Sequence, residues 1–315
     1  MNTTLSRREF LQGAALGAAS LLAASGLAAP PPLTIIDSHL HFYDPARPQG
    51  VPWPPKDDKI LYRTALPQDY QALPKPHPIA GAVVVEASPL VEDNQWILDL
   101  AAKEKLIAGF VGNLPVGTEE FAAHLKRFAA NPLFCGLRMR PAPKREHWDD
   151  PRFLADLKLL ADRGLALDLV GGGDILELIP KLTAAIPSLR IVIDHLASLR
   201  IDGKAPDPAW RQAMRAVAKH PNVFAKVSGL VEGSGKTGGQ APRDTEFYRP
   251  TLDAIWEMFG EDRLIYGSNW PVCEHFADLA SVQRIVTEYF TAKGAGPLKK
   301  VFSENARQAY QWVKR

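Results

Sequence analysis

The chain has 315 residues, of which 46% are hydrophobic and 23% are charged, and its formal net charge at pH 7 is +2. This composition is ordinary for a globular protein, and the length suits one domain with an N-terminal extension. The chain has no stripe of basic residues interleaved with aromatic ones, so we expect no nucleic-acid partner.

The N-terminal extension has the features of a targeting segment. Arg7 and Arg8 precede a stretch rich in Ala, Leu and Gly that runs to about Ala28. This pattern predicts a twin-arginine signal peptide over residues 1–28, and therefore a periplasmic or secreted protein. An uncleaved membrane anchor is the alternative, which the weak hydrophobicity of Ala and Gly disfavours. After cleavage we expect no stable association with a membrane.

Downstream, the chain repeats a short apolar run followed by an amphipathic stretch. Eight such runs are predicted to be strands, namely 34–41, 80–87, 106–113, 134–140, 164–171, 190–196, 223–229 and 264–269. Strands that alternate with helices predict βα units and a parallel sheet. Eight units predict an α/β fold of the closed (β/α)₈ TIM-barrel type, which needs about 250 residues. We therefore expect residues 29–315 to form a single domain.

Two of the intervening helices are marked by apolar residues at helical spacing. In the first, 92–104, the apolar stripe consists of Trp96, Leu100 and Ala101. In the second, 118–129, it consists of Phe121, Leu125 and Phe128. Such stripes indicate packing against the barrel.

Two long connections follow the first and seventh predicted strands. Residues 43–79 contain nine prolines, and residues 230–245 contain four glycines. Proline restricts the backbone, so we expect the first connection to be ordered without regular structure. Both connections emerge at the catalytic face of a barrel, where long loops commonly act as lids. Insertions without a function are the alternative.

The two cysteines are predicted to remain unpaired. Cys135 begins the fourth predicted strand and Cys273 follows the eighth. These positions lie at opposite ends of a barrel, too far apart for a disulfide.

The strongest candidate site lies at the end of the first predicted strand. His39 and His41 are two residues apart, so both imidazoles point to the same face of the strand. One face with two imidazoles suits a metal ion or a carbonyl substrate, although two histidines at this spacing also occur by chance in sheets.

Five motifs support this site. They are Ile-Asp-Ser-His-Leu-His-Phe-Tyr-Asp-Pro at 36–45, Cys-Gly-Leu-Arg at 135–138, Asp-His-Leu-Ala at 194–197, Lys-Val-Ser-Gly-Leu at 226–230 and Tyr-Gly-Ser-Asn-Trp-Pro-Val at 266–272. As an ordered set they resemble the amidohydrolase-related family (amidohydrolase 2) of the amidohydrolase superfamily, which includes L-fuconolactonase and 2-pyrone-4,6-dicarboxylate lactonase. The resemblance runs from about residue 34 to the C-terminus.

The resemblance implies a barrel whose catalytic face binds a small lactone and adds water to it. His39 and His41 match the family's first-strand pair, and His195 matches its sixth-strand histidine. Arg138 and Lys226 match cationic positions that hold a carboxylate or polarise the ester carbonyl.

The chain differs from the family pattern at Asn269. The family usually has Asp at this eighth-strand position, as a general base or metal ligand, and a carboxamide is not a base near neutral pH. We therefore consider Glu86, at the end of the second strand, as the replacement carboxylate, with His195 as the rival base. An ion pair of Glu86 with Arg138 or Lys226 is the alternative.

Three more residues are candidate contacts of the substrate: Trp53 in the proline-rich connection, Asp168 on the fifth strand, and Tyr248 after the glycine-rich connection. Asp168 occupies the position of a histidine in metal-dependent relatives. The nitrogen ligands that remain for a possible catalytic zinc ion are His39, His41 and His195. Binding of the substrate carbonyl by these imidazoles without a metal is the alternative.

The sequence therefore predicts an exported hydrolase, specifically a lactonase that acts on a sugar-derived or carboxylated lactone. A lactone isomerase and a non-oxidative decarboxylase on the same barrel are alternative enzymes. Because Asn269 replaces the usual Asp, a catalytically silent binding protein for a sugar acid is the alternative from another class. Fold analogy alone does not choose among them.

Overall fold

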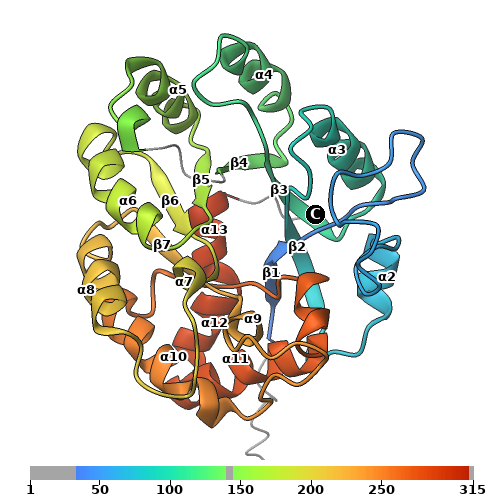
Figure 1. Cartoon of the computed structure of the whole chain (residues 1–315), viewed down its shortest axis with the longest axis vertical. Coiled ribbons are helices and arrows are strands. Elements are labelled where there is room, and N and C mark those ends of the chain that lie inside the picture. Colours follow the sequence, from blue (N-terminus) through green and yellow to red (C-terminus); the bar gives the residue numbers. More distant parts are fainter. Residues whose placement is uncertain (1–32, 140–144, 312–315) are drawn as a thin grey trace, which may run out of the picture. The chain divides into compact units, whose positions relative to one another are not determined.

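Eight parallel strands form one sheet, in the order in which they occur in the chain (Figure 1). They are β1 Ile35–Leu40, β2 Ile79–Val85, β3 Ile107–Gly112, β4 Phe134–Met139, β5 Ala166–Leu169, β6 Arg190–Ile193, β7 Val223–Val227 and β8 Leu264–Tyr266. This computed structural model describes residues 33–139 and 145–311, so the predicted signal segment 1–28 lies outside the described residues. The (β/α)₈ barrel expected from the sequence is confirmed.

The first and last strands meet just beyond the end of β8. The backbone nitrogen of Asn269 donates to the carbonyl of His39 at 2.7 Å, and that of His41 donates to the carbonyl of Trp270 at 2.8 Å. These hydrogen bonds close the barrel between β1 and β8. They also hold the backbone of Asn269 against the strand that carries the two histidines.

Helices surround the strands (Figure 1). The longer ones are α3 Asp93–Lys103, α4 Phe121–Phe128, α5 Pro151–Asp162, α6 Gly173–Ala185, α8 Pro208–Val217, α10 Thr245–Phe259 and α11 Leu279–Lys293. Shorter helical segments are α2 Pro67–Ala72, η1 Arg145–His147, α7 His195–Ser198, α9 Leu230–Gly233, η2 Val272–His275, α12 Ala295–Lys299, η3 Lys300–Glu304 and α13 Asn305–Tyr310. None of the helices in the described part of the chain combines the length and the apolar character needed to cross a bilayer.

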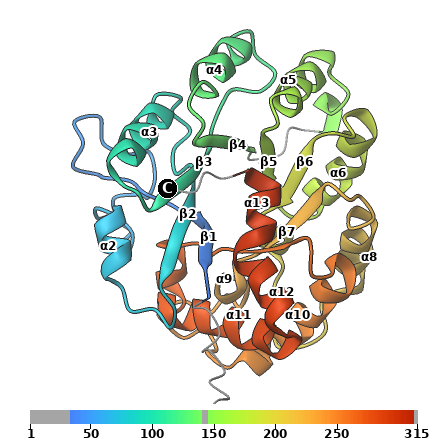
Figure 2. The same ribbon diagram turned by 180° about the vertical axis from the view of Figure 1, so that it is seen from behind.

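The C-terminal helix α13 fills one end of the barrel. Both views show it in the middle of the ring of strands (Figures 1 and 2). The Asn305 side chain donates to the carbonyl of Leu264, at the start of β8, and the Arg190 side chain, at the start of β6, donates to the carbonyl of Ala309. Helix α13 therefore lies at the N-terminal ends of the strands, and the opposite end is left for a site.

The barrel core is built from strand residues together with α13. A single buried cluster contains Val83, Val192 and Ile265 from the strands and Ala309 from α13. Cys135 belongs to the same cluster. It is a free thiol, as is Cys273, which agrees with the predicted absence of a disulfide between them.

The apolar stripe predicted for α4 is confirmed, but the one predicted for α3 is partly wrong. Ala101 is buried, whereas Trp96 and Leu100 are only half-buried. The helix is turned so that the polar residue Asn94 is buried, because its side chain donates to and accepts from the backbone of Asn113. Paired hydrogen bonds of this kind offset the cost of burying an amide.

The prediction that the first long connection lacks regular structure is wrong, and the second connection also contains a helix. Helix α2 forms inside residues 43–79, with Pro67 at its first position, where the missing N–H is no loss. Helix α9 forms inside residues 230–245 directly after β7. This short helix places Glu232 beside the strand ends.

Candidate active site

A cavity of about 400 Å³ lies at the C-terminal ends of the strands. Cavities of this size hold small molecules. Five polar residues of its lining lie at or just beyond five different strand ends, namely His41, Arg138, His195, Glu232 and Asn269. Parallel strands all end at the same rim of a barrel, so residues far apart in the sequence meet there. Trp53, Val272 and Phe276 contribute apolar walls.

The structure brings five of the sequence-predicted site residues to this cavity, namely His41, Trp53, Arg138, His195 and Asn269. His39, Asp168 and Lys226 lie inside the barrel with no exposed surface. Tyr248 is not among the described residues that line the cavity. It is buried on α10, where its hydroxyl donates to the carbonyl of Pro242 at 2.7 Å. The structure therefore gives Tyr248 a packing role in place of the predicted substrate contact.

A buried cluster of charges centres on Lys226, from β7. Its Nζ lies 2.7 Å from Asp168 Oδ2, 2.9 Å from Asp194 Oδ1 and 3.1 Å from His39 Nδ1. Burial alone would lower the pKa of Lys226, but the two carboxylates raise it. Lys226 is thus a permanent cation that balances buried negative charge.

The same cluster sets the protonation of its other members. Burial would raise the pKa of Asp194, but Lys226, His39 and Arg138 together hold it well below its usual range. Burial and the charge of Lys226 lower the pKa of His39 far below its usual value. At neutral pH, Asp194 is therefore ionised and His39 is neutral.

His41 is held in one tautomer. Its Nδ1 lies 2.9 Å from the carbonyl of Val85, and a carbonyl oxygen can only accept a hydrogen bond. Nδ1 therefore carries the proton, and in the neutral ring Nε2 carries the lone pair. The indole of Trp53 packs edge-on against this ring, with 5.8 Å between the ring centroids.

Arg138 joins the cavity to the buried cluster. Its Nε lies 3.2 Å from Asp194 Oδ2, and its Nη1 lies 3.8 Å from Glu86 Oε1. Glu86 is buried and is not among the described residues that line the 400 Å³ cavity. The geometry thus favours the ion-pair role of Glu86 over the role of general base.

His195 begins an unusual turn. All four residues of α7 have φ between 50° and 56°, a left-handed conformation that costs L-amino acids about 1–2 kcal/mol per residue. Trp210 Nε1 supports the turn by donating to the carbonyl of Leu196 at 2.9 Å. The imidazole of His195 is oriented by the hydroxyl of Ser228, which lies 2.9 Å from its Nδ1. Backbone strain of this kind is typical of functional sites.

Gly229, which precedes α9, allows this helix to approach His195. Its φ is +67°, and a Cβ there would lie only 2.6 Å from the Cβ of His195. We expect Gly229→Ala to destabilise the protein and to reduce activity, because it must displace His195 or α9. The strain of the left-handed backbone alone is of order 1–3 kcal/mol, and the clash adds to it. Urea denaturation measures the loss.

Gly235→Ala is the matched control for this change. Its φ is +65°, but a Cβ there meets nothing within 4 Å. It carries the backbone strain without the clash and should therefore be the milder of the two variants. Equal destabilisation and equal activity of the two variants would contradict the role assigned to the contact with His195.

Glu232 and Asp194 are site residues that the sequence analysis missed. Asn269 Nδ2 donates to Glu232 Oε1 at 2.8 Å, although the two residues are 37 positions apart. Oε2 of Glu232 is buried and has no hydrogen-bond partner among the described residues. Asp194 precedes His195 in the motif at 194–197, so a sequence motif marks it as a possible site residue. Glu232 belongs to no motif and is marked only by its place in the glycine-rich connection.

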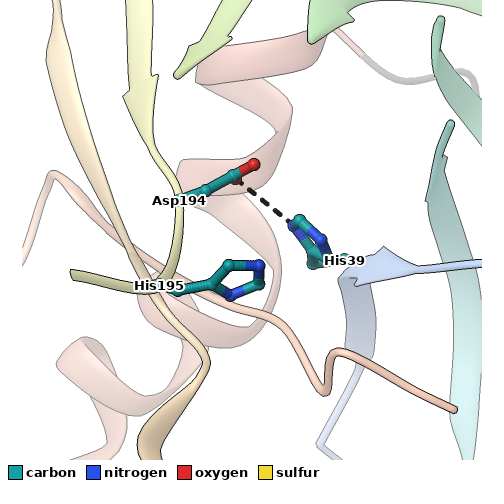
Figure 3. Close-up of side chains that lie close together, drawn as sticks. All are labelled: His39, Asp194 and His195. Atoms are coloured by element: carbon teal, nitrogen blue, oxygen red, sulfur yellow. Dashed lines mark ion pairs between the residues drawn. The ribbon is translucent and has the colours of Figure 1, made fainter. Parts of the chain in front are cut away.

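Three side chains could hold a metal ion. His39, Asp194 and His195 each offer one ligand atom, and these atoms lie within 4.8 Å of one another (Figure 3). The cluster contains Asp194 in place of His41, which the sequence predicts as the third ligand. Nε2 of His39 is buried and has no hydrogen-bond partner among the described residues.

Two imidazoles and one carboxylate are a donor set that divalent ions such as zinc accept. The residues therefore fit such an ion. Lys226 already neutralises part of the charge of Asp194, so we expect weaker binding than by the same three ligands without a neighbouring cation.

A family model described as amidohydrolase matches residues 36–312. The chain belongs to the amidohydrolase family. This confirms the resemblance seen in the five motifs. L-fucono-1,5-lactonase of Burkholderia ambifaria is 32% identical over 88% of this chain and 95% of its own length.

Solved structures of amidohydrolases share the fold. A crystal structure of an amidohydrolase from Burkholderia multivorans with bound HEPES has a TM-score of 0.77 at 25% identity, and the match covers 89% of this chain and 99% of that one. A second crystal structure from the same organism, with bound zinc, has a TM-score of 0.73 at the same identity and coverage.

Proposed function

We propose that this amidohydrolase is a lactonase that opens a sugar-derived lactone by addition of water. One observation carries the proposal: a guanidinium and two imidazoles, those of Arg138, His41 and His195, converge on one cavity of about 400 Å³. This volume suits a single sugar ring. The similarity to a curated L-fucono-1,5-lactonase supports the same substrate class.

The lining residues supply what ester hydrolysis needs besides a base. The developing oxyanion of the tetrahedral intermediate requires donors, and Arg138 is a donor that carries a full positive charge. Trp53 and Phe276 offer flat apolar surface to a ring. Water forms a bond to the carbonyl carbon, the ring C–O bond breaks, and the ring oxygen takes up a proton to become a hydroxyl.

The charges around the cavity favour a lactone without carboxylate groups. Arg138 is the cationic side chain among the described lining residues, and it already faces Asp194 and Glu86. Glu232 adds a further acidic group to the wall. Among the described lining residues, a substrate carboxylate would therefore meet little unbalanced positive charge, whereas the hydroxyls of a sugar lactone can hydrogen-bond to these groups.

A divalent ion, when bound, would be held by His39, Asp194 and His195 and would polarise the substrate carbonyl as a Lewis acid.

We also propose that the protein is exported. The twin-arginine motif at Arg7 and Arg8 supports it, and recovery of the mature protein in the periplasmic fraction would test it.

The test of the proposed function is an acid-release assay of the purified protein on two sets of substrates, neutral aldonolactones and dicarboxylate lactones, with and without prior chelation. We expect acid release from an aldonolactone and a product heavier than the substrate by one water. Loss of activity on chelation, restored by zinc, would show that the reaction needs a divalent ion, for which the His39 cluster is the candidate site. Isomerisation would leave the mass unchanged, and decarboxylation would release carbon dioxide. No turnover on any lactone by folded protein would contradict the proposal.

A further inference from the structure

We propose that Glu232 is the general base of this enzyme and that Asn269 is the residue that holds it in place. The assignment rests on the proposed lactone hydrolysis and names the group that activates the water. The carboxylate that the family usually carries on the eighth strand is absent here, and the structure contains another one directly beside that position.

The Glu232 side chain lies at the cavity. It lines this cavity together with His195 and Arg138, where the lactone is proposed to bind. Its Oε1 accepts a hydrogen bond from Asn269 Nδ2 at 2.8 Å, which anchors one of the two oxygens. Its Oε2 is buried without a hydrogen-bond partner among the described residues. An oxygen of this kind costs free energy unless a ligand or a water uses it.

The backbone of Asn269 is held firmly in place. Its φ is 59°, a left-handed value that Asn tolerates better than most residues. Its backbone nitrogen donates to the carbonyl of His39, and its own carbonyl accepts from the nitrogen of Cys273 at 3.1 Å. With the backbone held on both sides, the carboxamide stays directed at Glu232.

The side chains of Asn269 and Glu232 are also chemically complementary. A carboxamide donates to a carboxylate, whereas an Asp at position 269 would place a second negative charge beside Glu232. Two carboxylates at that distance do not both stay ionised, and one of them takes up a proton. Asn at position 269 thus keeps Glu232 available as a base, and the acid has in effect moved from the eighth strand to the helix after the seventh.

Glu232 is also better placed than the other candidate bases. Glu86 is paired with Arg138 and is not among the described residues that line the cavity. His195 does line it, but it is also one of the three side chains that could hold a metal ion.

Protonation of Glu232 agrees with this role. Burial raises the pKa of Glu232 to about 7, against the opposing hydrogen bond from Asn269. A base with a pKa near the working pH can accept a proton and then return it. The hydroxyl of Tyr248 and the thiol of Cys273 are titratable groups near Glu232. The other titratable or charged groups that share the cavity with it are His41, Arg138 and His195.

The step balances without any further reagent. A water molecule gives one proton to Glu232 while its oxygen bonds to the lactone carbonyl carbon. The tetrahedral intermediate collapses, and the ring C–O bond breaks. The proton on Glu232 goes to the departing ring oxygen, which leaves an open-chain hydroxy acid and the ionised base.

Glu232→Gln tests the assignment, because it keeps the size of the side chain and removes the base. We expect kcat/KM on the best aldonolactone to fall by about 10²–10⁴. In the wild type, kcat/KM should rise with pH and level off above an apparent pKa near 7, since the base acts in its ionised form. In Glu232→Gln this rise should disappear. In a second variant, Glu232→Ala, added formate should restore part of the activity.

Glu274→Gln is the matched control, since it removes a carboxylate from the neighbouring segment η2. The Glu274 carboxylate accepts a hydrogen bond from Trp270 Nε1, and Glu274 is not among the described lining residues. It should keep the pH profile of the wild type. A folded Glu232→Gln enzyme that retained most of the wild-type kcat/KM and its pH dependence would overturn the assignment while leaving the lactonase intact. A wild-type enzyme silent on every lactone would instead overturn the proposed function itself, and the assignment with it.

Discussion

Lys226→Met is expected to lower the free energy of unfolding by about 3–5 kcal/mol, because it removes one partner of a buried ion cluster. Lys226 has no exposed surface and lies within 3 Å of both Asp168 and Asp194. Without the ammonium, the two carboxylates are left close together in the barrel, and Arg138 faces only Asp194 among them. Urea denaturation of the two proteins at pH 7 measures the difference.

The effect of Lys226→Met should depend on pH with a definite sign. In the variant, the pKa values of Asp168 and Asp194 rise in the folded state, so the folded protein binds more protons than the unfolded chain above about pH 4. Stability of the variant should therefore increase as the pH falls from 7 towards 5. Adding Asp168→Asn to Lys226→Met should recover part of the loss, since it removes one of the stranded charges.

Lys204→Met, at an exposed position, is the matched control and should change stability by less than about 0.5 kcal/mol. If Lys226→Met proved as harmless as this control, the cluster would not hold the charges described.

Arg138→Met is expected to reduce kcat by about 10²–10³, the usual effect of removing one donor to an oxyanion. Arg138 is the cationic side chain among the described lining residues, and the reaction develops negative charge on the carbonyl oxygen. The effect should fall on kcat more than on KM, because the donor is needed most in the transition state. Steady-state kinetics on an aldonolactone measures both constants.

Two further variants separate charge from geometry at this position. Arg138→Lys keeps the charge but loses the planar fork of donors, so its activity should lie between those of Arg138→Met and the wild type. Arg152→Met removes an exposed arginine from α5 and should leave kinetics unchanged. A rise in KM alone in Arg138→Met would show that Arg138 binds the ground state and does not stabilise the oxyanion.

The α3 helix shows where sequence patterns mislead. Its apolar spacing placed Trp96 on the buried stripe, yet the indole is half-buried and lies under the guanidinium of Arg47, 4.6 Å away. The stripe shifted because the amide of Asn94 finds two backbone partners on Asn113. Hydropathy assigns no value to such hydrogen bonds, so it cannot anticipate a buried polar residue.

The candidate base shows the same limit at the site. The end of an apolar strand makes Glu86 a candidate base, with an ion pair as the alternative, and in the structure Arg138 lies 3.8 Å from it. Glu232 had no periodic or motif signal, and its importance follows only from the contact with Asn269. The spacing of residues along one element does not predict which residues of other elements they contact.

The amino-acid sequence by itself determined the barrel, the strand order and the position of His39, His41, Arg138, His195 and Asn269 at or near strand ends. It could do so because alternation of apolar runs and helices is a local property, and parallel strands bring their C-terminal ends to one rim. Only the tertiary structure decided which charges neutralise one another, that α13 fills the opposite end of the barrel, and that Glu232 stands beside Asn269. These are pairings between residues far apart in the chain, and their energies depend on distance and burial in three dimensions, which no sequence pattern records.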